Sequence, residues 1–195
     1  MRYYRFTTIS NIDRSTPMTA RTRNDFAQSL TAIFVGTVIW CVPEIIHMAR
    51  TGSFITRLSP ALPQGLLASE LSGGAATFLT VAITLKFAAL AVMAAFIAKA
   101  LVPMATGRVF TAANARALTI ASWGVGAWIL IRLGVEGLAN NMAARELGVE
   151  HWWNTGSGTP LSDIAPAFAL MITLGVLVSV VKRGAKLEEE VDGLV

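Results

Sequence analysis

Residues 75–98 read AATFLTVAITLKFAALAVMAAFIA, and Lys86 is the single charged side chain in this run. An α-helix needs about 20 mostly apolar residues, at about 1.5 Å each, to cross about 30 Å of hydrocarbon. The run therefore predicts a membrane-spanning helix. Three further windows of the same kind cover about residues 27–48, 118–138 and 164–181.

Polar residues follow three of these windows. Lys99 follows the second window, Asn140 with Asn141 follows the third, and Lys182 follows the fourth. We expect each membrane span to end at these positions, because polar and charged side chains are costly inside a bilayer.

The composition of the whole chain also favours lipid as its solvent. Of 195 residues, 54% are hydrophobic and 14% charged, whereas soluble domains carry about 25% charged residues. The 16 glycines, 7 prolines and single cysteine exclude a collagen-like repeat, a low-complexity chain and a disulfide scaffold. An open sheet would leave its backbone groups unpaired in lipid. The sequence therefore predicts an all-α fold, an integral membrane bundle of four transmembrane helices.

The orientation of this bundle follows from the basic residues in its connections. Lys and Arg number five before the first window, three between the second and third, and three after the fourth, whereas the other two connections hold two and one. Cytoplasmic loops carry the excess of bases, so we expect both termini in the cytoplasm and the chain in the bacterial inner membrane.

The chain divides into three parts on this reading. Residues 24–184 form the transmembrane domain, between a flexible cytoplasmic segment at 1–23 and an acidic cytoplasmic tail at 185–195. Met18 is an alternative start of the chain. Bases also precede the first apolar window, as in a signal peptide, but its apolar run exceeds the usual 7–15 or so residues and no clear cleavage site follows. An uncleaved span is favoured.

Four ionisable residues fall inside the predicted spans: Glu44, Lys86, Arg132 and Glu136. Each should face the bundle and find a partner, because an unpaired charge near the bilayer centre costs about 2.5–3.5 kcal/mol on insertion scales. Arg132 and Glu136 lie four residues apart on one helix face. We predict a cluster of Glu44, Arg132 and Glu136, approached by Lys86 from below and by His47 from above.

This cluster has two readings that the sequence leaves open. It is either a charge-neutral network that fixes the register of the helices or a proton, ion or ligand path. Neither a metal nor a cofactor is expected, since His47, His151 and Cys41 form no pair at ligand spacing. The sequence contains no phosphate loop, nucleophile elbow or zinc-protease motif and no basic stripe with interleaved aromatics. We therefore expect neither an enzyme nor direct binding of nucleic acid.

The connections and small residues support further expectations. The loop at 49–74 is rich in leucine and proline and is expected to lie on the membrane surface as an amphipathic cap. Trp152 and Trp153 are expected to anchor at the interface. Small residues four apart predict close helix contacts. These pairs are Ala91 with Ala95, Ala94 with Ala98, and Ser122 with Gly126.

Two cytoplasmic segments carry a recognisable pattern. The loop after the second window contains a glycine for a turn, an aromatic residue and an asparagine, and the tail contains a glycine, a leucine, acids and a final valine. These residues are Gly107, Phe110 and Asn114 in the loop and Gly184, Leu187, Asp192 and Val195 in the tail. With four spans around them, the segments resemble the bacterial membrane-protein family catalogued as domain of unknown function 2975.

The resemblance implies a protein without an established enzymatic activity that works beside a small cytoplasmic helix-turn-helix regulator. The implied partner surface consists of Arg108, Phe110, Asn114, Arg116 and the acidic stretch at 188–192. In the alternative reading, Phe110 and Asn114 only fix the loop. Two functions are therefore hypotheses: a regulatory or sensory partner of a cytoplasmic protein, or a small transporter or ion-conducting protein that uses the intramembrane charges.

Overall fold

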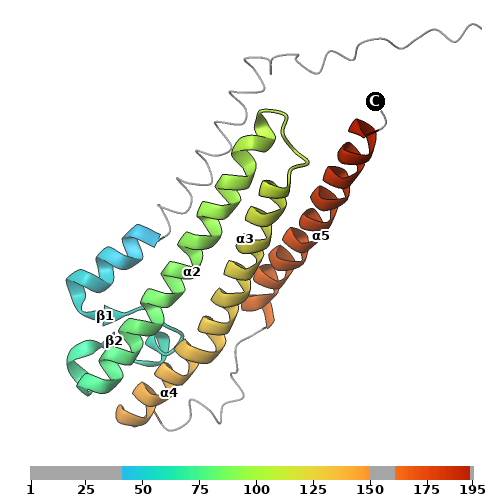
Figure 1. Ribbon diagram of the computed structural model, residues 1–195. Coiled ribbons are helices and arrows are strands. Elements are labelled where there is room, and N and C mark those ends of the chain that lie inside the picture. The colour runs from blue at the N-terminus through green and yellow to red at the C-terminus, as the bar shows by residue number, and fades with distance from the viewer. Residues whose placement is uncertain (1–40, 150–160, 194–195) are drawn as a thin grey trace, which may run out of the picture.

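The computed structural model describes residues 41–149 and 161–193 as a bundle of long helices (Figure 1). Three helices in these ranges are long and apolar enough to cross a membrane: α2 (Gly73–Ala105), the continuous helix Ala112–Glu146, and α5 (Leu161–Asp192). They agree with the second, third and fourth predicted windows. The chain is thus a helical protein with the features of a multi-pass membrane protein.

The first predicted window, 27–48, falls only partly within the described residues. Residues 41–51 are helical, and the rest of the window lies outside the described residues. So do the expected segment 1–23 with Met18, and the expected interfacial pair Trp152 and Trp153.

The helices continue past the predicted end of the span at all three windows. Lys99 lies inside α2, Asn140 lies inside α4 (Glu136–Glu146), and Lys182 lies inside α5. A polar residue ends the apolar part of a helix, but it does not remove the backbone hydrogen bonds that continue the helix into the interface and water. At 33 residues, α2 is about 50 Å long at 1.5 Å per residue, well beyond the hydrocarbon thickness.

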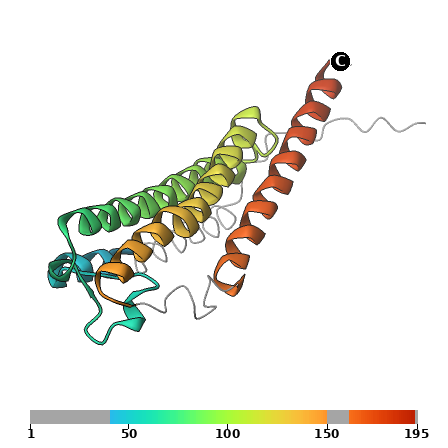
Figure 2. The same ribbon diagram turned by 90° about the horizontal axis from the view of Figure 1, so that it is seen from below.

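Helix α3 (Ala112–Leu130) lies between α2 and α5 and packs against both. The core between α3 and α5 is built largely from small and branched residues, among them Ala121, Val125 and Leu174. Figure 2 shows α5 inclined to α2 and α3, with its C-terminal turns leaving the bundle.

Two glycines mark close approaches of these helices. A Cβ on Gly126 would lie 3.7 Å from the Met171 sulfur of α5, so the predicted Ser122 and Gly126 pair does face another helix. A closer approach of α2 and α3 occurs at Gly124, where a Cβ would lie 3.2 Å from the Cβ of Met93. The four-residue spacing did not single out Gly124.

The loop at 49–74 folds back on the bundle, and its expected place at the membrane surface stays a prediction. Strands β1 (Ser53–Phe54) and β2 (Leu66–Leu67) pair antiparallel, with Ser53 opposite Leu67, and short 3-10 turns η1 (Ser59–Ala61) and η2 (Ala68–Glu70) accompany them. Leu58 and Leu66 are fully buried in a second core that includes Leu79 of α2 and Ala143 of α4.

Candidate functional site: an intramembrane charge network beside a cavity

Lys86 joins two acids from different elements. Its Nζ lies 3.4 Å from Glu136 Oε2 and 3.9 Å from Glu44 Oε1. Arg132 Nη1 donates to the other Glu136 oxygen, Oε1. The structure therefore brings together four of the five residues of the predicted cluster, from the 41–51 helix, α2 and the α3–α4 helix. Lys86 is the central link of the network, whereas the expectation placed it at the edge.

Burial differs sharply within this network. The Glu136 side chain is fully buried, whereas 11% of Lys86, 19% of Arg132 and 21% of Glu44 is exposed. Glu136 is thus a fully buried counter-ion of two bases, and the other three side chains are partly exposed.

His47 does not join this network. Its side chain is exposed, and Nε2 lies 3.3 Å from Ser53 Oγ. The hydroxyl of Thr51 donates to the His47 carbonyl oxygen at 2.8 Å. These contacts tie the end of the 41–51 helix to β1, so the expected place of His47 above the cluster is corrected to a structural link with the loop.

A π-helical turn, η3 (Ile131–Val135), places Arg132 and Glu136. Its closing bond runs from the Glu136 N–H to the Ile131 carbonyl oxygen, five residues back. Such turns occur mostly as single insertions in α-helices and are frequent at functional sites. Sequence reasoning missed this turn, because no residue pattern identifies an i→i+5 bond in an apolar helix.

A cavity of about 420 Å³ lies beside the network. Its polar wall contains Glu44, Lys86 and Arg132, and its apolar wall contains Phe87 and Leu90. Glu136 is not on the wall. The loop closes part of the cavity with its residues 55–57.

Arg57 and Trp128 are among the cavity residues that were not predicted as site residues. Arg57 of the loop lines the cavity and lies 3.8 Å, from Nε to Oδ2, from Asp163 of α5. The Trp128 ring also lines it, and its buried Nε1 finds no hydrogen-bond partner in the described part of the chain. The spacing of Trp128 to Arg132, one turn of a helix, was the available sequence signal for its place beside the network.

A second, mostly apolar cavity of about 250 Å³ adjoins the first, because both are lined by Leu90 and Trp128. Its other wall is formed by residues of α5 that include Pro166 and Leu170, with Asp163 as its charged residue. Together the two spaces combine a charged region with an apolar one. Across 41–149 and 161–193, no group of three His, Cys, Asp or Glu side chains is placed to hold a metal ion.

The loop motif between α2 and α3 forms a compact turn. Gly107 adopts a φ of +87°, which favours glycine. The Asn114 side chain is buried and donates from Nδ2 to the carbonyl oxygens of Arg108 at 2.6 Å and Val109 at 3.0 Å. Thr111 caps α3 by accepting the Asn114 backbone N–H at 3.1 Å.

The loop and tail motifs contact each other. The Phe110 ring packs so closely on Gly184 of α5 that a Cβ added there would overlap it. Arg108 and Arg116 remain exposed. Of the tail residues, Leu187 is 61% exposed, Asp192 ends α5, and Val195 lies outside the described residues. Phe110, Asn114 and Gly184 therefore serve the packing of this end of the bundle.

Comparison with protein-family models, curated proteins and solved structures finds no match for this chain. The resemblance to the family catalogued as domain of unknown function 2975 is carried only by the loop and tail residues quoted for it. The function of the chain must therefore be inferred from the geometry of the two ends of the bundle and of its charged interior.

Proposed function

We propose that this protein is a non-enzymatic regulatory or sensory partner that holds a cytoplasmic protein at the bacterial inner membrane, with four spans and both termini in the cytoplasm. Support for the orientation comes from the excess of Lys and Arg at the two termini and in the connection between α2 and α3. A helix-turn-helix regulator is the partner that the family resemblance implies.

The observation that carries the proposal is the length of α5. Its 32 residues span about 48 Å at 1.5 Å per residue, against about 30 Å of hydrocarbon. The helix therefore continues through the stretch that the sequence suggested was a tail. Beyond its apolar window it exposes Leu187 and Val191, which are 61% and 51% accessible and lie one turn apart on one face.

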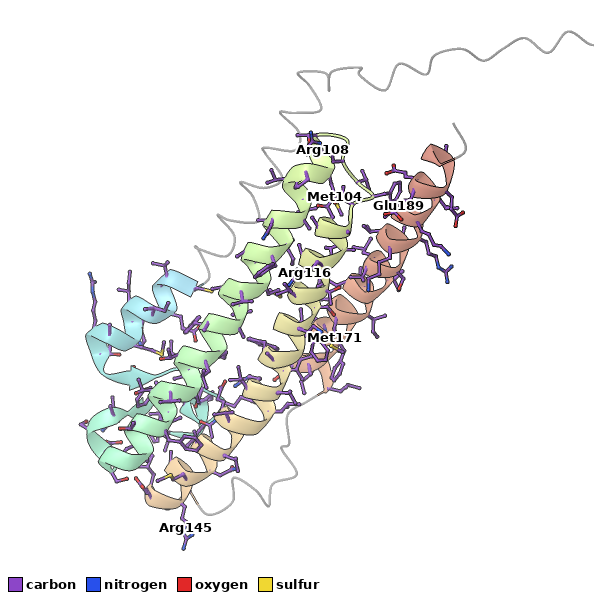
Figure 3. All side chains as sticks on the ribbon, viewed as in Figure 1. Met104, Arg108, Arg116, Arg145, Met171 and Glu189 are labelled. Carbon is purple, nitrogen blue, oxygen red and sulfur yellow. The ribbon has the colours of Figure 1, made fainter. Side chains whose placement is uncertain are left out.

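Exposed apolar side chains on a helix that stands off the membrane favour helix-in-groove recognition. Acidic residues at 188–190 flank this face, and Lys186 pairs with Glu190 at 3.7 Å. A partner with an apolar groove and basic residues at its rim fits this surface. Figure 3 places Glu189 of α5 and Arg108 of the loop at the same end of the bundle. Phe110 and Asn114 pack within the protein, so we leave them out of the proposed partner surface. Arg108, Arg116 and the acidic stretch at 188–192 remain from the residues that the resemblance implies.

The test is site-specific photo-crosslinking in the native bacterium. A photoreactive residue at Leu187 should capture one discrete protein, and the Leu187→Gln, Val191→Gln double variant should release that protein from the membrane fraction. The matched control is Leu177, which is exposed on the apolar part of the same helix and should capture lipid. Identical products from Leu187 and Leu177, with nothing released by the double variant, contradict the proposal.

The orientation has its own test. A reporter that is active only in the cytoplasm, fused to Val195, should be active. An inactive fusion, together with an active periplasmic reporter at the same position, contradicts the placement of α5 and with it the partner surface.

The alternative function is a small transporter or ion-conducting protein that uses Glu44, Lys86, Arg132 and Glu136. The complete burial of Glu136 between two bases favours a static network over a conduction path. The test is ion flux into proteoliposomes that contain the protein. A proton or ion flux that Glu136→Gln abolishes, while the variant stays folded, would favour the transport function over the regulatory one.

A further inference from the structure

We propose that the 420 Å³ cavity binds a small zwitterion with an apolar body, that is, a ligand with one anionic group, one ammonium group and a hydrocarbon or aromatic portion. An apolar α-amino acid has this chemistry, and so does the headgroup region of phosphatidylethanolamine. This site does not depend on the cytoplasmic partner proposed above, because none of the residues that line it belongs to the partner surface on α5.

The wall of the cavity offers unused donors. A guanidinium has five N–H donors, and Arg132 uses Nη1 toward Glu136. The Lys86 ammonium has three donors and faces carboxylate oxygens at 3.4 and 3.9 Å. The indole N–H of Trp128 is buried without a partner among the described residues. Because a buried donor without an acceptor is unfavourable, the anionic group of a ligand would satisfy the remaining donors of Arg132 and Lys86, and a turn of the Trp128 ring toward the cavity would let its N–H join them.

The same wall also offers an unused acceptor. The Glu44 carboxylate lies at the outer limit of an ion pair with Lys86, 3.9 Å away, and no closer partner for it occurs within the described ranges. A carboxylate has about four lone-pair sites, so it can accept from an ammonium group. A ligand with an ammonium group therefore fits Glu44, whereas a plain anion would approach it with like charge.

Charge balance favours a zwitterion over a simple anion. The acids Glu44 and Glu136 match the bases Lys86 and Arg132, and Arg57 faces Asp163 at 3.8 Å. The charged groups described around the cavity thus balance one another, and an added net charge would be uncompensated in a region of low dielectric. A neutral zwitterion supplies both kinds of group without changing that balance.

The size and the apolar wall define the rest of the ligand. A volume of about 420 Å³ falls within the range of small-molecule pockets, about 300–1,000 Å³. Phe87 and Leu90 face the body of the ligand, and the adjoining 250 Å³ cavity beyond Leu90 and Trp128 extends the apolar space. A leucine- or phenylalanine-sized side chain fits the first space, and a longer chain would extend toward the second.

The experiment measures binding to the full chain in nanodiscs of phosphatidylcholine and phosphatidylglycerol. The probes are L-phenylalanine, 3-phenylpropionate, which lacks the ammonium group, and phenethylamine, which lacks the carboxylate. L-phenylalanine should bind at least about tenfold more tightly than either analogue, because each lost group removes a hydrogen bond to a charged partner.

Three variants test which side chain binds the ammonium group of the ligand and which binds its carboxylate. Glu44→Gln should make L-phenylalanine and 3-phenylpropionate bind alike, and Trp128→Phe should weaken the two carboxylate probes about tenfold while leaving phenethylamine unchanged. Trp123→Phe is the matched control, since Trp123 lies on the same helix and is 75% exposed; it should change nothing. The thermal midpoint of each variant in the same nanodiscs confirms that it is folded.

Added phosphatidylethanolamine separates the two sources of the ligand. Competition with L-phenylalanine identifies the lipid headgroup as an occupant, whereas an unchanged affinity identifies a free amino acid, and both results support the zwitterion site. Equal binding of 3-phenylpropionate and L-phenylalanine to the wild-type protein overturns the proposal. So does an equal effect of Trp128→Phe and Trp123→Phe, or an absence of both amino acid and phosphatidylethanolamine binding.

Discussion

Replacement of Glu136 by glutamine tests whether the charge network holds the bundle together. The carboxylate is fully buried and contacts both Lys86, at 3.4 Å, and Arg132. Glutamine preserves the size of the side chain and a carbonyl oxygen that accepts from Arg132. The substitution removes the negative charge and places an amide NH2 donor toward Lys86, so two bases remain with Glu44 as the single acid of the network.

The expected loss of stability is about 3 kcal/mol. Removal of one partner from a buried ion pair typically costs about 3–5 kcal/mol, because the other charge stays buried without compensation. We expect the lower end, since Glu44 lies 3.9 Å from Lys86 and still compensates part of its charge. A second substitution, Lys86→Met, restores neutrality with Arg132 and Glu44 and should recover at least about half of the loss, as coupled neighbours do.

The assay is equilibrium unfolding in detergent micelles with sodium dodecyl sulfate as denaturant, followed by the loss of helical circular dichroism. Glu190→Gln is the matched control, because Glu190 pairs with Lys186 on an exposed part of α5 and such a pair contributes less than about 0.5 kcal/mol. A loss below about 1 kcal/mol for Glu136→Gln would refute the structural role of the network. So would a double variant whose loss is the simple sum of the two single losses.

Three further predictions use the same unfolding assay. Gly184→Ala should lower stability by about 1–3 kcal/mol, since the added Cβ overlaps an aromatic ring, whereas Gly175→Ala, with open space around it on the same helix, should raise stability by up to about 1 kcal/mol. Gly124→Ala should lower stability by about 1 kcal/mol, because its Cβ would meet a methionine of α2 at 3.2 Å; Gly137→Ala, with no neighbour within 4 Å, is its control. Ser72→Ala should cost about 1 kcal/mol, because the Ser72 hydroxyl caps α2. Equal effects at a test glycine and its control, or an unchanged Ser72 variant, would contradict these assignments.

The candidate site was predicted in part. Apolar windows and the cost of a charge in lipid were enough to single out Lys86, Arg132 and Glu136 and to expect them to meet, since a charge in a span must find a partner. The same reasoning could not decide which base lies between the acids. That depends on the rotation of α2 about its axis, and rotation is set by contacts such as Gly124 with Met93.

The loop at 49–74 shows a different limit. Its leucines are evidence of burial, but a lipid surface and a protein surface are equally apolar, so composition did not distinguish a membrane cap from a strand pair against α2 and α4. The structure places Leu58 and Leu66 in the second core, and the position of the loop relative to the membrane stays a prediction. Similarly, Phe110 and Asn114 stood out in the sequence, and only their contacts assign them to the fold rather than to a partner.

The sequence by itself was enough to predict a membrane environment for this protein, the approximate positions of three long apolar helices and the presence of charges that need partners. These properties depend only on residues that are close together in the chain, because the hydropathy of a helix is the sum over its own residues. The tertiary structure alone decided the π-helical turn before Glu136, the central place of Lys86, the cavity beside it and the packing of Phe110 on Gly184. Each of these depends on the tilt and rotation of helices that are distant in the chain, and these are set by the fit of side chains between elements.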